Sequence, residues 1–408
     1  MARSLYICYF GANQPLVQTQ VIPYLRELVK GGHEMSLLTF EPGEVDEKTV
    51  REELAADGIA WHWLRYHKRP SVPATMFDIA NGARFIRKLN AERAFDMLHA
   101  RSHVPMMMAA LTSKFSTRRP RLLFDIRGFL PEEYVDAGVW SEGGAIYRWV
   151  KRIEARLMKG ADGFVVLTEE AREIIEDQVG SRPLEVIPCC VDFERRFSGD
   201  HASERERIRK QFGIEGRFVI VHLGALGGLY LTDKMADLLA AARSRDKSVF
   251  ALFLTQSDPD LIVPLLKSRG FGDEDLYVGR VPAQDVEGYL HASDVGLSFV
   301  KATFATQSRS PTKIPEYLAC GVPVVANAGV GDIDTLLSGD KIGVIADDLS
   351  EAGHFQTLDA LEGLMQDADL ADRCRAAAAK RFDLKSVGGE RYRRVYQELT
   401  SRNEDGSI

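Results

Sequence analysis

The sequence has 408 residues, of which 45% are apolar and 27% are charged, a composition typical of globular proteins. Its length exceeds one typical domain and predicts two or three. The formal net charge of −7 gives no overall positive field, which argues against nucleic acid as a partner.

Cysteine usage and the N-terminal residues indicate a compartment. No cysteine pair has metal-ligand spacing, so we expect free thiols, no metal site and no disulfide. The apolar run at residues 4–10 lacks the features of a signal peptide, and no stretch approaches the ~20 apolar residues that span a bilayer. We therefore expect a cytoplasmic protein, and contact with the inner face of the membrane is left open.

Short apolar runs alternate with helical patterns along the first half. A strand is predicted at residues 5–10, followed by a loop at 11–15, a helix over 17–30 and a second strand over 34–39. Further strands are predicted at 97–99, 122–126 and 164–167, with a helix over 147–159. This order predicts a parallel sheet covered by helices on both faces.

The second half repeats the alternation. Strands are predicted at 218–223, 249–254, 275–278, 295–299 and 322–326, and helices at 232–243, 283–292 and 313–320. A polar segment follows residue 192, so we predict an N-terminal domain of residues 1–192, joined by a C-terminal helix within 386–408, and a second domain of residues 193–385. The predicted fold class is α/β, with two doubly wound, Rossmann-like domains facing a central cleft.

The segment 308–326 contains the strongest chemical pattern. A helix is predicted to start near Thr312, capped by Ser310 or Thr312, and such a helix start is an anion site. Lys313 adds a positive charge, and Glu316 lies one turn later, where it can accept hydrogen bonds from a ribose diol. Lys313 as a surface lysine and Glu316 as a solvated carboxylate are the alternatives.

This segment resembles the donor-binding signature of the retaining glycosyltransferases of family 4, which have the GT-B fold, in a variant beginning Pro311-Thr-Lys and continuing to Ala326. The resemblance implies that Glu316 binds the nucleotide ribose. Ser308 stands where the commoner signature has its first Glu, which affects how the donor sugar is held.

Other stretches support the same resemblance in the same order. Residues 186–192 resemble the interdomain segment of the family, with Cys189 and Cys190 in place of Asn-Gly. Residues 277–281, which include Arg280 and Val281, and residues 289–298 resemble its nucleobase-binding region. The resemblance therefore covers nearly the whole chain.

Two glycine-containing loops are predicted to approach the donor phosphates. Gly11 lies in the first loop, and Gly224, Gly227 and Gly228 lie where the family has a phosphate loop that usually carries Arg and Lys. Backbone N–H groups of these glycines would hold the diphosphate, with Lys313 and Arg280 as its cations. A tight strand-to-helix turn is the alternative.

The first domain contributes candidate catalytic residues. Residues 122–132 resemble a subset of the family in which Arg127 takes the place of a histidine that reaches the donor sugar. Asp125 and Arg127 are either part of the active site or a structural ion pair. His103 is a candidate to line the cleft, and His99 is expected to be a satisfied core or rim histidine.

These patterns predict a retaining, metal-independent hexosyltransferase or related enzyme that uses a nucleoside diphosphate sugar and no further cofactor. Its acceptor would be a glycan, a lipid-linked sugar or a small molecule, most simply in assembly of a surface polysaccharide or glycolipid. The alternatives are a nucleotide-sugar 2-epimerase and a nucleotide-sugar-binding protein that has lost catalysis.

Overall fold

The computed structural model describes residues 2–116, 118–197 and 201–401, which form two compact units. Unit 1 comprises the chain up to Pro188 together with the residues from Leu384 onward, and unit 2 comprises Cys189–Asp383. The first crossing between units lies four residues before the predicted boundary at 192–193, and the second lies two residues before 385–386.

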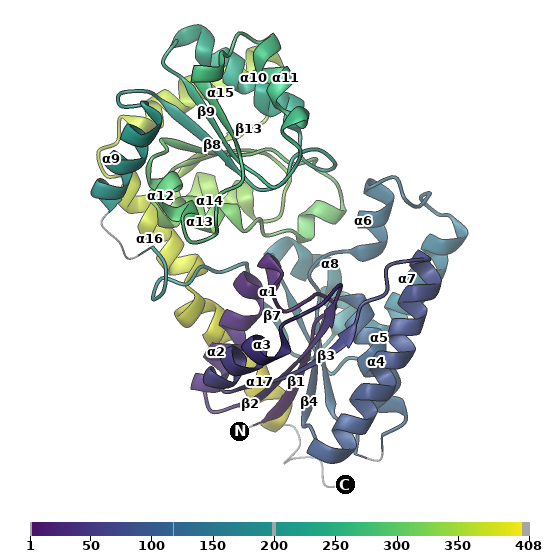
Figure 1. The fold of residues 1–408 in the computed structure, drawn as a ribbon. Coiled ribbons are helices and arrows are strands. Elements are labelled where there is room, and N and C mark those ends of the chain that lie inside the picture. The colour runs from purple at the N-terminus through teal and green to yellow at the C-terminus, as the bar shows by residue number, and fades with distance from the viewer. Residues whose placement is uncertain (1, 117, 198–200, 402–408) are drawn as a thin grey trace. The chain divides into compact units, whose positions relative to one another are not determined.

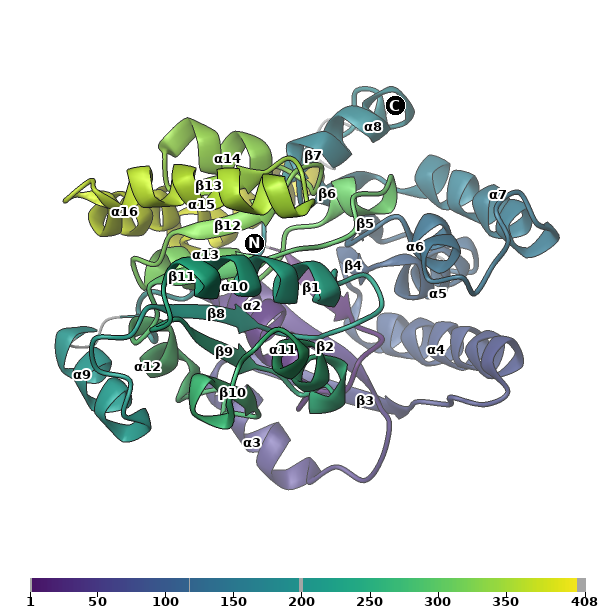
Figure 2. The same cartoon turned by 90° about the horizontal axis from the view of Figure 1, so that it is seen from above.

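Unit 1 is built on a seven-stranded parallel sheet of order β3-β2-β1-β4-β5-β6-β7 (Figures 1 and 2). Its strands are β1 (Arg3–Ile7), β2 (Glu34–Glu41), β3 (Ile59–Arg65), β4 (Met97–Arg101), β5 (Arg121–Asp125), β6 (Gly163–Val166) and β7 (Leu184–Val186). Its helices are α1 (Pro15–Gln20), α2 (Ile22–Lys30), α3 (Glu47–Ala56), α4 (Ser71–Arg93), α5 (His103–Lys114), α6 (Leu130–Asp136), α7 (Ala145–Gly160), α8 (Glu169–Val179) and α17 (Glu390–Ser401).

The predicted single helix over 17–30 is wrong in one respect. The structure has two helices, α1 and α2, which meet at Val21, where the backbone leaves the helical region with φ −129°. Pro23 in the first turn of α2 has no N–H to donate, so a continuous ladder of helical hydrogen bonds cannot pass through it.

Helix α17 returns to unit 1 after the whole of unit 2. The hydroxyl of Tyr396 lies 2.9 Å from His99 Nδ1, and Tyr392 Oη donates to Asp125 across 3.1 Å. Both tyrosines are buried, as are Val395 and Leu399 on the same helix. The core of unit 1 therefore forms only when α17 packs against the strands of the first 188 residues.

Unit 2 contains a six-stranded parallel sheet of order β10-β9-β8-β11-β12-β13 (Figures 1 and 2). Its strands are β8 (Val219–Leu223), β9 (Phe250–Leu254), β10 (Leu276–Gly279), β11 (Val295–Ser298), β12 (Val324–Asn327) and β13 (Gly343–Ala346). Its helices are α9 (His201–Phe212), α10 (Thr232–Arg245), α11 (Val263–Ser268), α12 (Val286–His291), α13 (Lys313–Ala319), α14 (Ile333–Asp340), α15 (Glu351–Met365) and α16 (Leu370–Phe382).

Alternate residues of the central strands bury both faces of the unit 2 sheet. Val219 and Val221 of β8 pack into the apolar cluster that contains α13, whereas Ile220 packs into the cluster that contains α10. A strand buried on both sides has its polar chemistry at its ends. The loops after the strands are therefore where a site can form.

All five cysteines are buried and unpaired with one another. Within the described residues, no group of three or more His, Cys, Asp or Glu side chains is placed to hold a metal ion. No helix in the described part of the chain has the length and apolarity needed to cross a bilayer.

Candidate functional site

The sheet of unit 2 has a topological switch point between β8 and β11. The chain leaves β8 toward β9 on one side, and β11 lies on the other side, so the loops after these two strands diverge. Ligands of doubly wound sheets bind in the crevice that such divergence leaves at the carboxyl ends of the strands. Gly224 follows β8 directly, and α13 comes from the segment after β11.

Lys313 places a buried cation at this switch point. The residue is only 4% exposed, and its Nζ has no hydrogen-bond partner among the described residues. Nζ lies 4.4 Å from the centre of the Tyr230 ring, and a Cβ built on Gly224 would lie 3.5 Å from it. Burial lowers the pKa of Lys313 to about 7, although Glu316 acts in the opposite direction. A buried ammonium group without a hydrogen-bond partner is one that an anion would stabilise.

His222, near Lys313, stays neutral at pH 7. Burial, and then the charge of Lys313, lower the pKa of His222 to about 3. Its ring nitrogens lie 3.2 Å from the Leu297 carbonyl and 3.0 Å from the Ala225 carbonyl. His222 therefore adds no second positive charge beside the lysine.

Glu316, one turn beyond Lys313 on α13, pairs with Arg196. Arg196 Nη1 donates to Glu316 Oε1 across 3.1 Å, and the glutamate side chain is 15% exposed. Burial raises the pKa of Glu316 even though Arg196 and Lys313 favour its charged form. The sequence did not point to Arg196, because it lies 120 residues from its partner.

Tyr317 fixes α13 against the end of β8. The Leu223 N–H donates to the Tyr317 hydroxyl across 2.7 Å, immediately before Gly224. The Tyr317 ring packs on Gly296 of β11, where a Cβ would lie only 2.4 Å from the ring. The strand-facing side of α13 thus sets the position of Lys313. Tyr317 lies within the segment 308–326 but had no predicted role, and a glycine within a strand was the available signal for this close packing.

The glycine loop differs from the prediction that its N–H groups face a phosphate. The Gly224 N–H donates to Leu254, and the Gly227 N–H donates to Thr232 Oγ1, across 2.9 Å in each case. Both N–H groups are used within the chain, which argues against the predicted donation of either group to a phosphate. Gly228 is the one of the three whose N–H has no acceptor among the described residues. Gly224 has φ +118°, so a side chain there would be strained.

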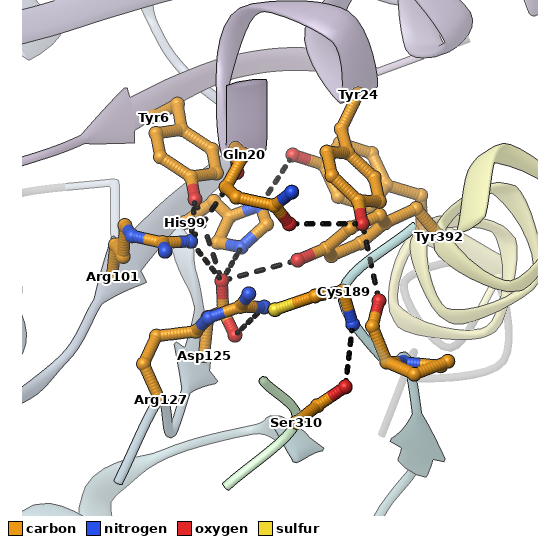
Figure 3. Close-up of polar contacts among 12 residues, drawn as sticks. Tyr6, Gln20, Tyr24, His99, Arg101, Asp125, Arg127, Cys189, Ser310 and Tyr392 are labelled. Carbon is orange, nitrogen blue, oxygen red and sulfur yellow. Dashed lines mark hydrogen bonds and ion pairs between the residues drawn. The ribbon is translucent and has the colours of Figure 1, made fainter. Parts of the chain in front are cut away.

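The predicted helix cap is also wrong. Thr312 precedes α13 but makes no capping hydrogen bond, because its backbone is already helical rather than extended. Ser310 Oγ instead accepts from the Cys189 N–H at 3.1 Å (Figure 3). Helix α13 has only seven residues, so the predicted anion site at its start depends on Lys313.

Ser308, Arg280 and Val281 lie in different surroundings. Ser308 is 1% exposed, and its hydroxyl donates to the Ala305 carbonyl across 2.8 Å within a 3₁₀ turn. Arg280 follows the edge strand β10, is exposed and donates to the Gln256 carbonyl. Val281 packs at the border of the core. The described contacts link none of these three to Lys313.

In unit 1 the predicted catalytic pair lies at the end of β5. Asp125 is fully buried, and Arg127 Nη1 lies 3.4 Å from its Oδ1 (Figure 3). The hydroxyls of Tyr6 and Tyr392 both donate to Oδ2, at 3.3 and 3.1 Å. The carboxylate of Asp125 has no exposed surface, which favours the alternative of a structural ion pair with Arg127 over direct contact with a substrate.

Positive charge decides the ionisation of Asp125. Burial alone would raise the pKa of this carboxyl group, but the charge of Arg127, the adjacent His99 ring and the charge of Arg101 together outweigh burial and hold it well below its usual range. His99 Nε2 lies 3.5 Å from Asp125 Oδ2, and Arg101 Nη1 lies 3.8 Å from it. Burial lowers the pKa of His99, so this ring is neutral and belongs to the core, as expected.

Gly11 and His103 follow β1 and β4, the two strands at the switch point of unit 1. His103 is 3% exposed, and its Nε2 lies 3.3 Å from Glu154 Oε2. Gly11 lies against the Glu41 carboxylate, where a Cβ would be 2.5 Å from Oε2. The negative charge of Glu41 opposes the predicted approach of a phosphate to Gly11. Ser102, just before His103, has φ +72°, a strained conformation that the sequence did not reveal.

A comparison with models of protein families finds a match in the first half of the chain. The family model described as Glycosyltransferase Family 4 matches residues 17–195, which lie almost entirely in unit 1.

These residues are therefore similar to glycosyltransferase family 4.

This family 4 segment agrees with the family predicted from the sequence. The motif at 308–326 lies outside it, so the match is independent of the residues that first suggested the family.

One curated protein is similar in sequence to part of this chain. A GDP-mannose-dependent α-(1-6)-phosphatidylinositol monomannoside mannosyltransferase from Mycolicibacterium smegmatis is 28% identical over 228 residues. The alignment covers 55% of this chain and 56% of the relative, so the chain spans about half the length of the curated relative it matches.

Solved structures share the fold over nearly the whole chain. A glycosyltransferase from Rickettsia africae ESF-5 is 14% identical, with a TM-score of 0.72 and 98% of each chain covered. Anabaena HepE in complex with UDP and glucose is 16% identical, with a TM-score of 0.71, and covers 98% of this chain and 100% of its own. The predicted GT-B fold of two Rossmann-like α/β domains is thereby confirmed.

Proposed function

We propose that this protein is a glycosyltransferase that moves a sugar from a nucleoside diphosphate sugar to an acceptor hydroxyl, with retention at the anomeric carbon. The family 4 segment and the GT-B fold support this activity. The Anabaena protein binds UDP and glucose, and the Mycolicibacterium relative is named as GDP-mannose-dependent.

The observation that carries the proposal is the unsatisfied ammonium group of Lys313. A buried cation without a hydrogen-bond partner, beside a glycine loop at a switch point, fits one oxygen of a diphosphate. Glu316, held by Arg196 one turn away, is the hydrogen-bond acceptor that we assign to the ribose hydroxyls.

Lys313 would act on the leaving group. Cleavage of the bond between the sugar and the diphosphate builds negative charge on the diphosphate. A preorganised cation stabilises that charge more in a buried site than in water. We propose that Lys313 supplies this stabilisation without a metal ion, and that the leaving phosphate takes the proton of the acceptor hydroxyl, as the family resemblance implies.

For the acceptor we propose a lipid-linked sugar or a surface glycan. The Mycolicibacterium relative is named for a phosphatidylinositol monomannoside acceptor, which is a glycolipid. Arg127, anchored by buried Asp125, is the unit 1 residue that we assign to the donor sugar or to a phosphate of the acceptor.

Nucleotide binding tests the donor site. Calorimetric titration of the full chain with UDP, GDP and ADP should give saturable binding of one nucleotide. Lys313→Met, which removes the charge but keeps an unbranched side chain, should weaken it roughly 10- to 100-fold, the usual effect of losing a charge-assisted hydrogen bond.

Lys380→Met is the matched control, because Lys380 is an exposed lysine of α16 in the same unit. It should leave the affinity unchanged. Equal weakening by both variants, or wild-type affinity in Lys313→Met, would contradict the assignment of Lys313. No binding of any nucleotide by the wild type would contradict the proposed function itself.

A further inference from the structure

Exposed apolar side chains are concentrated in unit 1. Of the fourteen large apolar residues that are strongly exposed within the described chain, eleven belong to unit 1 and three to unit 2. Single exposed apolar residues need no explanation, but a cluster of them does. Most of the eleven come from the beginning of α4 or from the region around the beginning of α7.

The first turns of α4 present three such side chains. Val72, Met76 and Phe77 are 53%, 47% and 56% exposed. Val72 and Met76 are four apart and lie on one helical face, and Phe77 extends this exposed apolar surface to the adjacent face. Lys68 and Arg69 precede them, and neither forms an ion pair with a described residue. Residues 59–77 contain no carboxylate, although the whole chain has a net charge of −7.

A buried carboxylate holds this segment in place. Asp78 is fully buried and accepts from Tyr9 at 2.6 Å and from the His67 backbone at 3.0 Å. His67 Nδ1 lies 2.6 Å from the same carboxylate, and its ring packs edge-on against Phe77 with centres 5.0 Å apart. Phe77 is therefore held outward by fixed neighbours.

The beginning of α7 presents a similar surface. Val139, Ile146 and Trp149 are 62%, 49% and 47% exposed. Arg148 and Arg152 are exposed on the same helix, and neither forms an ion pair with a described residue. This end of α7 combines apolar side chains with two cations outside ion pairs, although the exposed Glu142 just before the helix adds a negative charge.

The fold brings the two surfaces to one end of unit 1. Helix α4 follows β3 and therefore begins at the carboxyl ends of the parallel strands, whereas α7 ends just before β6 and therefore begins toward the same ends. Both helices pack on α5, and Figures 1 and 2 show all three together on one side of the sheet.

We propose that this end of unit 1 binds the surface of an anionic lipid bilayer. The apolar contacts would come from Val72, Met76, Phe77, Val139, Ile146 and Trp149, and the charge contacts from Lys68, Arg69, Arg148 and Arg152. Aromatic and aliphatic side chains flanked by Arg and Lys are the composition that enters the headgroup region of anionic membranes. We refer to this set as the basic apolar surface.

Charge selects the bilayer over a second copy of the chain. In a symmetric dimer through this surface, the unpaired Arg and Lys side chains of one copy would face those of the other, and such like-charge contacts are unfavourable. An anionic membrane offers an apolar phase for the exposed apolar side chains and negative headgroups for the unpaired cations. The inference deepens the proposed function, because it places acceptor transfer at a membrane, but vesicle binding itself does not depend on that function.

Vesicle sedimentation with the full chain tests the proposal. Vesicles of phosphatidylcholine with added phosphatidylglycerol should bind the protein, those of phosphatidylcholine alone should bind it more weakly, and high salt should reduce binding. Reversal of Arg69 or Arg152 to Glu should each weaken binding about fivefold or more. The triple variant Val72→Ser/Met76→Ser/Phe77→Ser should abolish it.

The matched control is Leu261→Ser/Phe304→Ser/Met365→Ser, which changes the three strongly exposed apolar residues of unit 2 and should bind vesicles like the wild type. A blue shift of tryptophan emission on adding anionic vesicles should disappear in Trp149→Phe and persist in Trp63→Phe. Unchanged circular dichroism of each variant excludes unfolding.

Three results would overturn the proposal: no binding of the wild type to anionic vesicles, equal binding by the two triple variants, or a vesicle-free dimer that only the unit 1 triple variant dissociates. Nucleotide titration of the same preparations keeps this outcome separate from that of the proposed function. Failure of vesicle binding with intact nucleotide binding would concern the basic apolar surface alone.

Discussion

The buried ammonium group of Lys313 is part of the proposed donor site, but its burial lowers the stability of the folded protein. Its Nζ is buried without a hydrogen-bond partner among the described residues, and burial lowers its pKa from 10.5 to about 7. Desolvation of the ammonium group therefore opposes folding whenever the lysine is protonated. A bound diphosphate would remove that penalty, which links stability to occupancy of the donor site.

The first prediction concerns the pH dependence of that penalty. Because the folded pKa of Lys313 lies below the unfolded value, the unfolded state binds more protons between about pH 7 and 10.5, and wild-type stability should gain from this residue as pH rises through that range. Lys313→Met lacks this gain. Without ligand it should be more stable than the wild type by several kcal/mol at pH 6, and this advantage should shrink toward pH 10.

Urea unfolding of both proteins across this pH range measures the difference. Lys380→Met should follow the wild-type profile. A constant difference between wild type and Lys313→Met at every pH would show that the lysine is not buried as a cation.

The residues of the proposed donor site were predictable where chemistry follows local sequence. Lys313 and Glu316 are three apart on one helix, so a motif places them together. The partner of Glu316, Arg196, and the tyrosine donor to Asp125, Tyr392, come from 120 and 267 residues away. Such pairings depend on the tertiary fold. Asp125 was placed in a site because nothing in its own strand indicates that the returning α17 covers it.

At the scale of elements, β11 and α13 pack so closely that a Cβ atom at Gly296 would clash with the ring of Tyr317. Gly296 lies under the ring of Tyr317, whose hydroxyl accepts from the Leu223 N–H at the end of β8. The contact ties the helix that carries Lys313 to both strands of the switch point. Packing and site geometry are therefore coupled at one glycine.

The second prediction is that Gly296→Ala destabilises the protein by about 1–3 kcal/mol and weakens nucleotide binding as well. The new Cβ would lie 2.4 Å from the Tyr317 ring, so the ring and α13 must shift. Gly363→Ala, on an exposed part of α15 with no neighbour within 4 Å, is the matched control. It should stabilise by up to about 1 kcal/mol.

Chemical unfolding and nucleotide titration of both variants test this coupling. If Gly296→Ala lost stability but bound nucleotide normally, the Tyr317 contact would not position Lys313.

The sequence predicted the strands better than the helix ends. Buried strands such as β8 and β9 are continuous apolar runs, and the predicted ranges 218–223 and 249–254 lie within one residue of them. The break at Val21 and the missing cap of α13 were not predicted, for different reasons. Pro23 at a second helical position stops one helix and begins another. Thr312 has a helical backbone and Ser310 accepts from Cys189, so neither side chain caps α13.

At the scale of the whole molecule, the two units differ in how the chain closes them. Unit 2 is one continuous segment, Cys189–Asp383, whereas unit 1 needs α17 from beyond it. Tyr392 and Tyr396 on α17 satisfy Asp125 and His99 in the centre of unit 1. Without α17, the buried Asp125 carboxylate would lose the hydrogen bond from Tyr392. The core of unit 1 would also lose the apolar face of this helix.

The third prediction follows from this asymmetry. A fragment of residues 189–383 should fold cooperatively and bind the same nucleotide as the full chain. A fragment of residues 1–188 should be unfolded or loosely packed, and coexpression with residues 384–408 should restore its cooperative unfolding.

Calorimetry and amide hydrogen exchange of the fragments decide between these outcomes. A stable, cooperatively folded fragment 1–188 would contradict the role given to α17.

The return of α17 also has a consequence for synthesis. Although unit 1 is translated first, the ribosome must add about 200 further residues before α17 exists, which takes roughly 10–40 s at typical rates. During that interval unit 2 can fold to completion, while the earlier part of the chain waits with its β5 carboxylate and the α17 docking surface uncovered. The domain that is made second is thus the first to be finished, and the nascent N-terminal domain is the part that a chaperone would need to protect.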